Sequence, residues 1–346
     1  MDHSKIETVE FETLAEVHIV GSISHSDFNF TTWEFGDKPA GESRKLCLRL
    51  SGESQMIDSD SLNKMAGATT KKGPYTNLGR SQEIIVLSSF FLRRRLTMPV
   101  LVRMGDNPMI INQDAYDPCH ELRNGSSNLA SLKEWFKLWD KEDATSQHDY
   151  LRAARLYFFA CRLMDKDLGA SYLMFTSAIE ALAKNHELRS EPRLSEINEP
   201  LDTAISELID DPLIAEKLRT AALKKEGFIA RKFVEFSMSN IEEAFWNEGA
   251  GPDYGRVKKE NIQQILKNIY KQRSLTLHSG EPFPIYVYSC PRDGGEISFA
   301  PACMTEGRKW EKKDYIPYIH FTERLTNHIL RTCLKRACAN KFEQGK

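Results

Sequence analysis

An arginine and a histidine near the end of one predicted helix are the side chains in this sequence best suited to chemistry. The stretch IYKQRSLTLHSGEPFP, residues 269–284, places Arg273 five positions before His278. A guanidinium presents a planar fork of donors that fits a phosphate, and an imidazole that titrates near neutral pH can move protons. This pair therefore suits acid–base cleavage of a phosphodiester.

Arg273 stands where the helical pattern calls for another hydrophobic residue. The apolar positions before it recur at spacings of four and three, at Ile262, Leu266 and Ile269. Arg273 continues that face and Leu277 follows, although a guanidinium is rarely buried without a partner. His278 lies in the last turn before Gly280, where the negative end of the helix dipole favours imidazolium and is expected to raise the pKa.

Residues five positions apart on a straight helix point about 140° away from each other. Arg273 and His278 can therefore converge on one small group by two routes. In the first, the helix loosens near His278. In the second, another copy of the chain supplies the opposing pair.

The two residues match the R-x(4–6)-H motif, and the chain resembles the HEPN superfamily of helical nucleases. The stretch NIYKQRSLTLHSG (268–280) is similar to the ApeA-like HEPN pattern, and FTSAIEALAK (175–184) is similar to that group's second-helix motif. The resemblance covers roughly residues 148–340. Ser279 stands between His278 and Gly280, whereas the family often has glycine directly after the histidine.

The resemblance implies a metal-independent endoribonuclease that acts as a homodimer through its HEPN domain, with RNA as substrate and a 2′,3′-cyclic phosphate as product. It also implies a toxin or antiphage defence effector. In this interpretation His278 is the general base or acid, and Arg273 stabilises charge on the phosphate. The sequence shows no cluster with metal-ligand spacing, so we expect no metal or other cofactor.

Two further residues are candidates for supporting roles. Glu180, at the edge of an apolar helix stripe, could pair with Arg273 or orient His278, or it could be a flanking surface carboxylate. Ser274 could bond phosphate or simply solvate the helix end. We expect Tyr270 to pack rather than to stack on a base.

Two basic stretches are candidates for RNA contact. EGRKWEKKDY (306–315) surrounds an aromatic with cations, at Arg308, Lys309, Trp310, Lys312 and Lys313. Such a pattern suits single-stranded RNA, although most charge runs are solvated faces. Arg93, Arg94 and Arg95 in FLRRRL (91–96) pose the same choice, and a solvated helix end is the favoured interpretation.

Composition narrows the class of protein. The formal net charge of -2 argues against a protein that coats nucleic acid through bulk charge, but it leaves room for a local basic groove. Seven irregularly spaced cysteines without a CxxC pair do not suggest a disulfide framework. With neither a signal-peptide pattern nor a long apolar run, we expect a cytoplasmic protein without a membrane span.

The predicted fold class is α+β with two domains. Residues 1–145 form a mixed α/β, strand-rich domain, with strands at 10–24, 44–50 and 99–104, a long loop at 51–80, and helices at 81–96 and 131–139. Ser81 is the expected N-cap of the first of these helices. The polar stretch 140–149 marks the predicted domain boundary.

Residues 146–346 are predicted to form an all-α, HEPN-like helical bundle. A buried helix after His148 and a second over 170–186 should form an antiparallel hairpin. Further helices are expected at 195–225, at 228–238, from about Val257, and from Tyr315 to Ala339. The segment 284–301 is predicted to be an inserted β-hairpin with Asp293-Gly294 at its turn.

Two alternatives to a nuclease remain open. One is a non-catalytic HEPN module that binds RNA or a partner, in which Arg273 and His278 serve dimer packing. The other is a ligand-binding or scaffold protein that acts through residues 1–145. No family is suggested by that domain, which in the nuclease interpretation senses a trigger ligand or protein.

Overall fold

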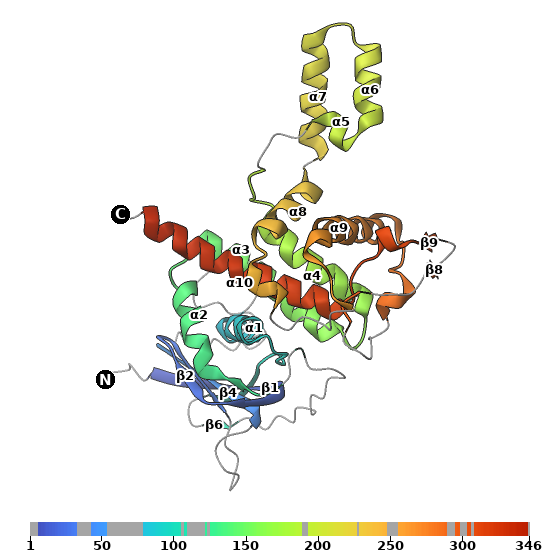
Figure 1. Cartoon of the computed structure of the whole chain (residues 1–346). Coiled ribbons are helices and arrows are strands. Elements are labelled where there is room, and N and C mark those ends of the chain that lie inside the picture. The colour runs from blue at the N-terminus through green and yellow to red at the C-terminus, as the bar shows by residue number, and fades with distance from the viewer. Residues whose placement is uncertain are drawn as a thin grey trace. The chain divides into compact units, whose positions relative to one another are not determined.

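The structure of the chain is a computed structural model. It describes residues 6–32, 43–53, 79–104, 107–108, 122, 125–188, 193–226, 228–247, 255–288, 295–297, 303–305 and 308–344. An N-terminal, mainly antiparallel sheet is followed by a helical region, so the predicted α+β class is confirmed (Figure 1). Within these ranges no helix is both long and apolar enough to cross a membrane.

The chain divides into two compact units, at positions that differ from the predicted boundary. Unit 1 comprises residues 1–178 and 319–346, and unit 2 comprises residues 179–318. The polar stretch 140–149 lies inside unit 1: residues 140–143 form a short turn and residues 144–149 begin a helix. The Nε2 of Gln147 donates to the carbonyl of Trp139 at 3.0 Å, across this turn. A polar stretch without periodic apolar residues is typical of a surface turn as well as of a domain linker, so this pattern did not identify the boundary between the units.

The sheet of unit 1 has the strand order β2-β3-β4-β1-β5-β6, and β7 pairs with β1 in parallel. Its strands are β1 (Ile6–Val20), β2 (Ser22–Ser24), β3 (Phe28–Thr32), β4 (Ser43–Glu53), β5 (Val100–Met104), β6 (Asn107–Pro108) and β7 (Ser127–Asn128). The long pair β1–β4 aligns Val9 with Leu50 and Phe11 with Leu48. The predicted strands at 10–24, 44–50 and 99–104 are confirmed, with a break at Gly21, whose φ is +80°. The predicted loop at 51–80 lies mostly outside the described residues.

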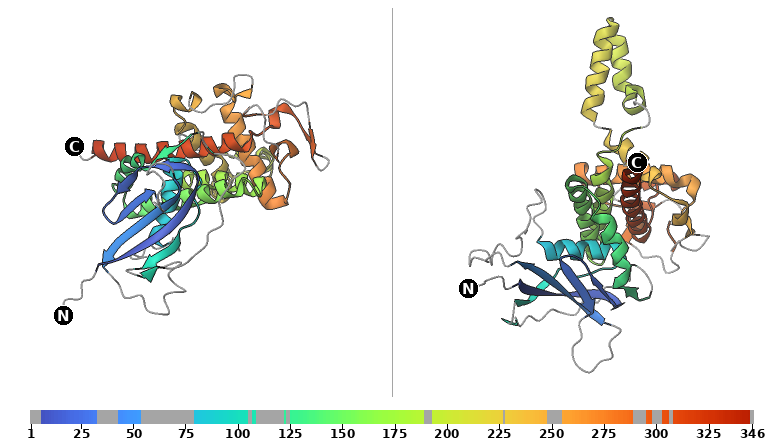
Figure 2. Two further views of the ribbon diagram at one scale, coloured as in Figure 1. Left: turned by 90° about the horizontal axis from the view of Figure 1, so that it is seen from below. Right: turned by 90° about the vertical axis from the view of Figure 1, so that its left-hand side faces the viewer.

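Helices cover one face of this sheet (Figures 1 and 2). They are α1 (Arg80–Leu92), α2 (Leu132–Trp139), preceded by a 3₁₀ turn at Leu129–Ser131, α3 (Ala144–Leu163) and α10 (Ile319–Gln344). Helix α1 is buried over most of its length, because the sheet lies on one side of it and α3 on the other. The helix predicted at 81–96 is confirmed as far as Leu92, but residues 93–96 are not helical and the N-cap is Gly79, not Ser81.

The predicted helix hairpin is also present. Helix α3 is followed by α4 (Leu168–Ala183), and the hydroxyl of Ser171 donates to the carbonyl of Ala160 at 2.8 Å. The rings of Tyr157 and Phe175 meet at 5.6 Å between centroids. The division between the units falls inside α4, after Ala178.

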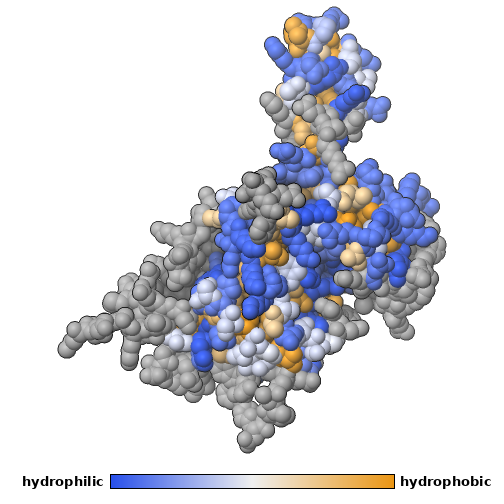
Figure 3. Space-filling model, turned by 60° about the vertical axis from the view of Figure 1, so that its left-hand side comes forward, coloured by the Kyte–Doolittle hydropathy of each residue, from blue (hydrophilic) through white to orange (hydrophobic). Residues whose placement is uncertain are grey.

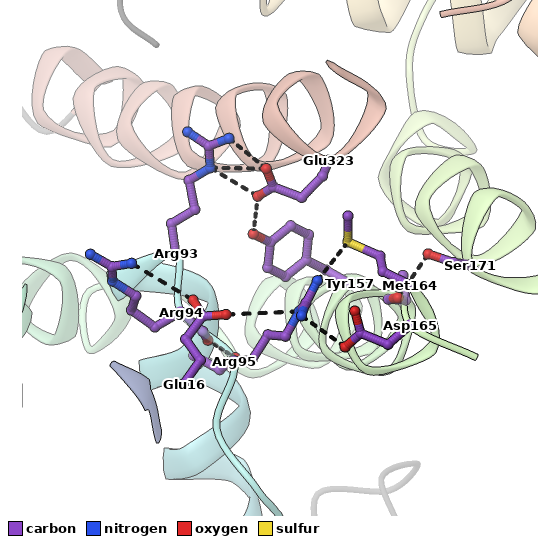
Figure 4. A network of polar contacts seen from close by, with 11 residues as sticks. Glu16, Arg93, Arg94, Arg95, Tyr157, Met164, Asp165, Ser171 and Glu323 are labelled. Carbon is purple, nitrogen blue, oxygen red and sulfur yellow. Dashed lines mark hydrogen bonds and ion pairs between the residues drawn. The ribbon is translucent and has the colours of Figure 1, made fainter. Parts of the chain in front are cut away.

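Arg93, Arg94 and Arg95 are not a solvated helix end. Arg93 closes α1 in the left-handed region, with φ at 54°, and its guanidinium bonds both carboxylate oxygens of Glu323 at 2.5–3.0 Å (Figure 4). Arg94 and Arg95 are fully buried, and Arg95 pairs with Asp165 at 2.9 Å. The favoured prediction is wrong because three charges in sequence do not reveal that buried carboxylates lie opposite.

In its described residues, unit 2 consists of helices and one short strand pair. Its elements are α5 (Leu194–Ile197), α6 (Glu199–Leu208), α7 (Pro212–Glu226), α8 (Ile229–Ser239), α9 (Ile262–Ser279), 3₁₀ turns at Glu243–Trp246, Lys259–Asn261, Ile285–Tyr288 and Lys312–Asp314, and strands β8 (Cys303–Thr305) and β9 (Arg308–Trp310). Helices α6 and α7 lie side by side as a hairpin (Figure 1). The predicted helices at 195–225 and 228–238 are thereby confirmed.

The β-hairpin predicted at 284–301 is contradicted where the structure describes this segment, because residues 284–288 and 295–297 contain no strand. Residues 285–288 are a 3₁₀ turn with Tyr286 and Val287 buried and their neighbours exposed, so burial does not alternate as it does in a strand. The phenol of Tyr286 bonds the backbone of Ile316, which fixes this turn. Asp293 and Gly294 lie outside the described residues, and the short antiparallel pair β8–β9 occurs further along the chain.

Candidate functional site

Arg273 on α9 is held by Glu180 on α4. The Nη2 of Arg273 donates to Oε2 of Glu180 at 2.5 Å, and the two side chains are 17% and 18% exposed. Two functional roles were predicted for Glu180, pairing with Arg273 or orienting His278, and the structure shows the pairing with Arg273. Leu266 and Ile269 are buried as the pattern predicted, but Leu277 is half exposed, so the apolar face of α9 ends before His278.

Tyr270 is the third member of this cluster. Its hydroxyl donates to Oε1 of Glu180 at 3.3 Å, and the guanidinium of Arg273 lies 5.7 Å from its ring centroid. Its ring packs against Phe233 of α8 at 5.2 Å, as expected for a packing residue. Burial, reinforced by the carboxylate of Glu180, raises the pKa of Tyr270 to about 12, so the phenol is a hydrogen-bond donor at neutral pH.

His278 lies exposed in the last turn of α9. The helix continues without interruption to Ser279, and the N–H of Gly280 still bonds the carbonyl of Thr276 at 3.2 Å. The first predicted route to convergence, a helix that loosens near His278, is therefore wrong. Within one chain the side chains of Arg273 and His278 leave a regular helix about 140° apart.

The end of α9 is fixed by two features. Gly280 adopts the left-handed conformation, with φ at 71°, that favours glycine at a helix end. Gln272 is 1% exposed, and its amide donates to the carbonyl of Pro282 at 2.9 Å and to the hydroxyl of Thr276 at 3.2 Å. This buried glutamine ties the outgoing chain back to the helix and so holds the turn that carries His278.

A groove of about 750 Å³ lies beside the cluster, between α8 and α9. Its apolar lining includes Phe228, Ile229, Ala230, Val234 and Leu275. Its polar lining from α9 includes Lys267, Tyr270, Lys271 and Ser274, at spacings that place all four on neighbouring turns. Ser274 therefore lies in the groove next to Tyr270, whereas Arg273 and His278 are not part of its lining.

The basic stretch at 306–315 is arranged differently from the prediction. Trp310 is only 2% exposed, so its ring is not available in this structure for stacking on a base. Lys309 and Lys313 are exposed, and both face Glu311, at 3.9 and 3.2 Å. The side chains of Arg308 and Lys312 lie outside the described residues. An aromatic among cations can thus be a core residue on a strand whose neighbours are solvated.

The groove on α8 and α9 was not predicted. One sequence feature could have indicated it: Lys267, Lys271 and Ser274 are spaced four and three apart, so they share one side of the helix, separate from its apolar face. The series shows where cations gather but not that α8 borders them. In the described residues no three His, Cys, Asp or Glu side chains gather as metal ligands.

Comparison with known proteins gives no relative from which to transfer a function: no protein-family model, no curated protein and no solved structure matches the chain.

Proposed function

We propose that the chain is a metal-independent endoribonuclease of the HEPN type. The observation that carries the proposal is the placement of Arg273: it continues the apolar face of α9, is held by Glu180, and precedes an exposed His278 on the last turn. These residues also form the motif on which the HEPN resemblance depends.

RNA carries its own nucleophile in the 2′-hydroxyl, so cleavage needs proton transfer and charge stabilisation. His278 of one copy takes the proton of the 2′-hydroxyl as its oxygen attacks phosphorus. The partner copy's corresponding histidine donates a proton to the leaving 5′-oxygen, which leaves a 2′,3′-cyclic phosphate. Arg273 stabilises the charge that develops on the phosphate oxygens, and Ser274 can donate to the same group.

Two copies are part of this proposal because the helix stays regular to Ser279. A single α9 points Arg273 and His278 in different directions, so a homodimer through the helical region is needed to gather them. Residues 1–145 then sense a trigger or gate the activity, and the role implied by the resemblance is that of a toxin or antiphage defence effector in the cytoplasm.

A second candidate is a non-catalytic module that binds RNA or a partner. The observation that favours it is the bond between Arg273 and Glu180, because a guanidinium already neutralised by a carboxylate has less attraction for phosphate. In that case Arg273 serves packing within unit 2 and His278 is a surface residue. A scaffold or ligand-binding role of residues 1–145 would be detected by a thermal-shift screen of the whole chain.

Incubation of the purified chain with total RNA in EDTA separates these candidates. We expect cleavage that resists EDTA, ends in 2′,3′-cyclic phosphate detected by mass spectrometry, and disappears in His278→Ala and in Arg273→Ala. His18→Ala is the matched control, because His18 is an exposed histidine on β1 and should leave cleavage unchanged. Tight RNA binding without cleavage, equal in wild type and His278→Ala, would favour the binding module.

A further inference from the structure

The end of the α6–α7 hairpin exposes two leucines to an unusual degree. Leu208, the last residue of α6, is 78% exposed, and Leu213, at the start of α7, is 74% exposed. Figure 3 shows hydrophobic surface at this end of the hairpin, among hydrophilic side chains. Exposed apolar side chains gathered at one place often mark a contact with another protein.

The hairpin does not need these leucines for its own folding. Its small core consists of Leu194, Ile205 and Ala215, with Ile209, Ala222 and Leu223 packed against it. The guanidinium of Arg219 on α7 also bonds Asp202 and Ser206 of α6, each at 2.6 Å. Leu208 and Leu213 lie outside this set, so packing within the hairpin does not explain them.

The charge around the two leucines is negative. Glu207, Asp210 and Asp211 surround them, and all three are exposed. Asp211 accepts from the backbone N–H of Leu213 at 2.8 Å, whereas Glu207 and Asp210 form no ion pair within the described ranges. An acidic end of this kind is repelled by an anionic lipid surface and attracted to a basic protein surface.

The groove between α8 and α9 has the opposite character, because Glu235 in its lining is already paired with Arg231 of the same helix at 2.8 Å. Its floor is apolar, with Ile229 45% exposed, and its α9 side carries Lys267 and Lys271. Both lysines are exposed, and neither forms an ion pair in the part of the chain that the structure describes. The hairpin end thus presents apolar side chains flanked by carboxylates that form no ion pair, and the groove presents an apolar surface flanked by lysines that form none among the described residues.

We propose that the end of the α6–α7 hairpin of one copy docks into the α8–α9 groove of a second copy. Leu208 and Leu213 enter the apolar bed, while Glu207 and Asp210 face Lys267 and Lys271. Because every copy carries both surfaces, reciprocal exchange closes a twofold dimer without a leftover surface. Tyr270 and Ser274 line the groove, so the docked hairpin lies beside the Arg273–Glu180 pair. This contact goes beyond the proposed nuclease activity and does not depend on it.

Sedimentation equilibrium of the full chain, without RNA, tests the exchange. From about 1 to about 100 µM protein, we expect the wild type to pass from monomer to dimer. Leu208→Asp with Leu213→Asp, and separately Lys267→Glu with Lys271→Glu, should each leave a monomer. Ile285→Asp is the matched control, because Ile285 is 63% exposed but belongs neither to the hairpin nor to the groove lining.

Reversing the charges on the hairpin end in one variant and on the groove in another tests whether these two surfaces pair. Glu207→Lys with Asp210→Lys in one chain, mixed with Lys267→Glu and Lys271→Glu in the other, should restore a heterodimer that neither variant forms alone. Circular dichroism checks that each variant is folded. A wild type that stays monomeric, leaving the groove to another occupant, would overturn the proposal. So would a dimer unaffected by either set, a species larger than a dimer, or failure of the mixture to associate.

Discussion

Glu180 and Arg273 come from helices α4 and α9, 93 residues apart in sequence, and their side chains meet at 2.5 Å. Tyr270 donates to the other oxygen of the same carboxylate, so Glu180 is bound on both sides. The pair is partly exposed, which lowers both its desolvation cost and its strength. Its cationic member is the residue proposed to bind phosphate, so substitutions here affect stability and cleavage together.

A double-mutant cycle on this pair is the first prediction. Glu180→Ala and Arg273→Ala should each lower the free energy of unfolding by about 1–2 kcal/mol, less than for a fully buried pair. The double variant should cost less than the two together, with a coupling of about 1 kcal/mol. Urea unfolding measures all four proteins. Strict additivity would show that the contact contributes nothing to stability.

His278→Ala should separate folding from catalysis. The imidazole is exposed at the end of α9, so the free energy of unfolding should change by less than about 0.5 kcal/mol. RNA cleavage should nevertheless fall to background, because the proton-transfer group is gone. A variant that retains wild-type cleavage would remove His278 from the mechanism, and a large loss of stability would point to a structural role instead.

Local patterns predicted most of the fold. The alternation of strand 44–50 and the helical spacing at 131–139 were sufficient, because each describes one face of one element. The apolar series on α9 also located Arg273 correctly on a face that continues a core. What these patterns could not give is the partner across the chain: Glu323 opposite Arg93 and Glu16 opposite Arg94 and Arg95 depend on tertiary contacts.

The errors have the same origin. Trp310 looked like a stacking platform because its neighbours are lysines, yet its own ring faces a core. Residues 285–288 looked like a strand because tyrosines and a valine favour strands, but the turn after Pro284 and the bonds of Tyr286 to Ile316 decide otherwise. For the site, the sequence named Arg273, Glu180 and His278 but not the groove, since α8 borders it only in the folded chain.

Trp310→Ala should act on stability and not specifically on RNA. Removal of a buried indole leaves a cavity, and we expect a loss of about 3–5 kcal/mol in the free energy of unfolding of the region that contains it. Lys309→Glu is the comparison, because this exposed side chain should leave stability nearly unchanged while weakening RNA binding. Urea unfolding measures stability and filter binding measures RNA affinity for both variants. The prediction is contradicted if Trp310→Ala weakens RNA binding without loss of stability and Lys309→Glu destabilises the fold.

Arg93 and Glu323 form a pair in which one partner is almost fully buried. Glu323 is 1% exposed and also accepts from the phenol of Tyr157 at 2.5 Å. Arg93→Ala leaves that carboxylate without its counter-charge, so we expect a loss of about 3 kcal/mol or more. Replacing both residues, as Arg93→Met with Glu323→Met, should cost less than Arg93→Ala alone. The opposite order in urea unfolding would show that the charges themselves stabilise unit 1.

Glu16 should make the stability of unit 1 depend on pH. Its carboxylate is buried on β1, and Arg94 and Arg95 lie 3.8 Å away, beyond hydrogen-bond distance, so burial dominates and raises the pKa from 4.5 to about 7. The folded chain then keeps this proton between pH 4.5 and 7, where the unfolded chain releases it. Stability from this group is complete below pH 4.5 and is lost as the pH rises through 7.

Comparison of wild type with Glu16→Gln isolates that contribution. Between pH 5 and pH 8 the wild type should lose about 2–3 kcal/mol more than Glu16→Gln in the free energy of urea unfolding. Glu134→Gln is the control, because Glu134 is exposed on α2 and should keep the wild-type dependence. If the wild type instead gained stability over this range relative to Glu16→Gln, the two arginines would outweigh burial and hold Glu16 ionised in the fold.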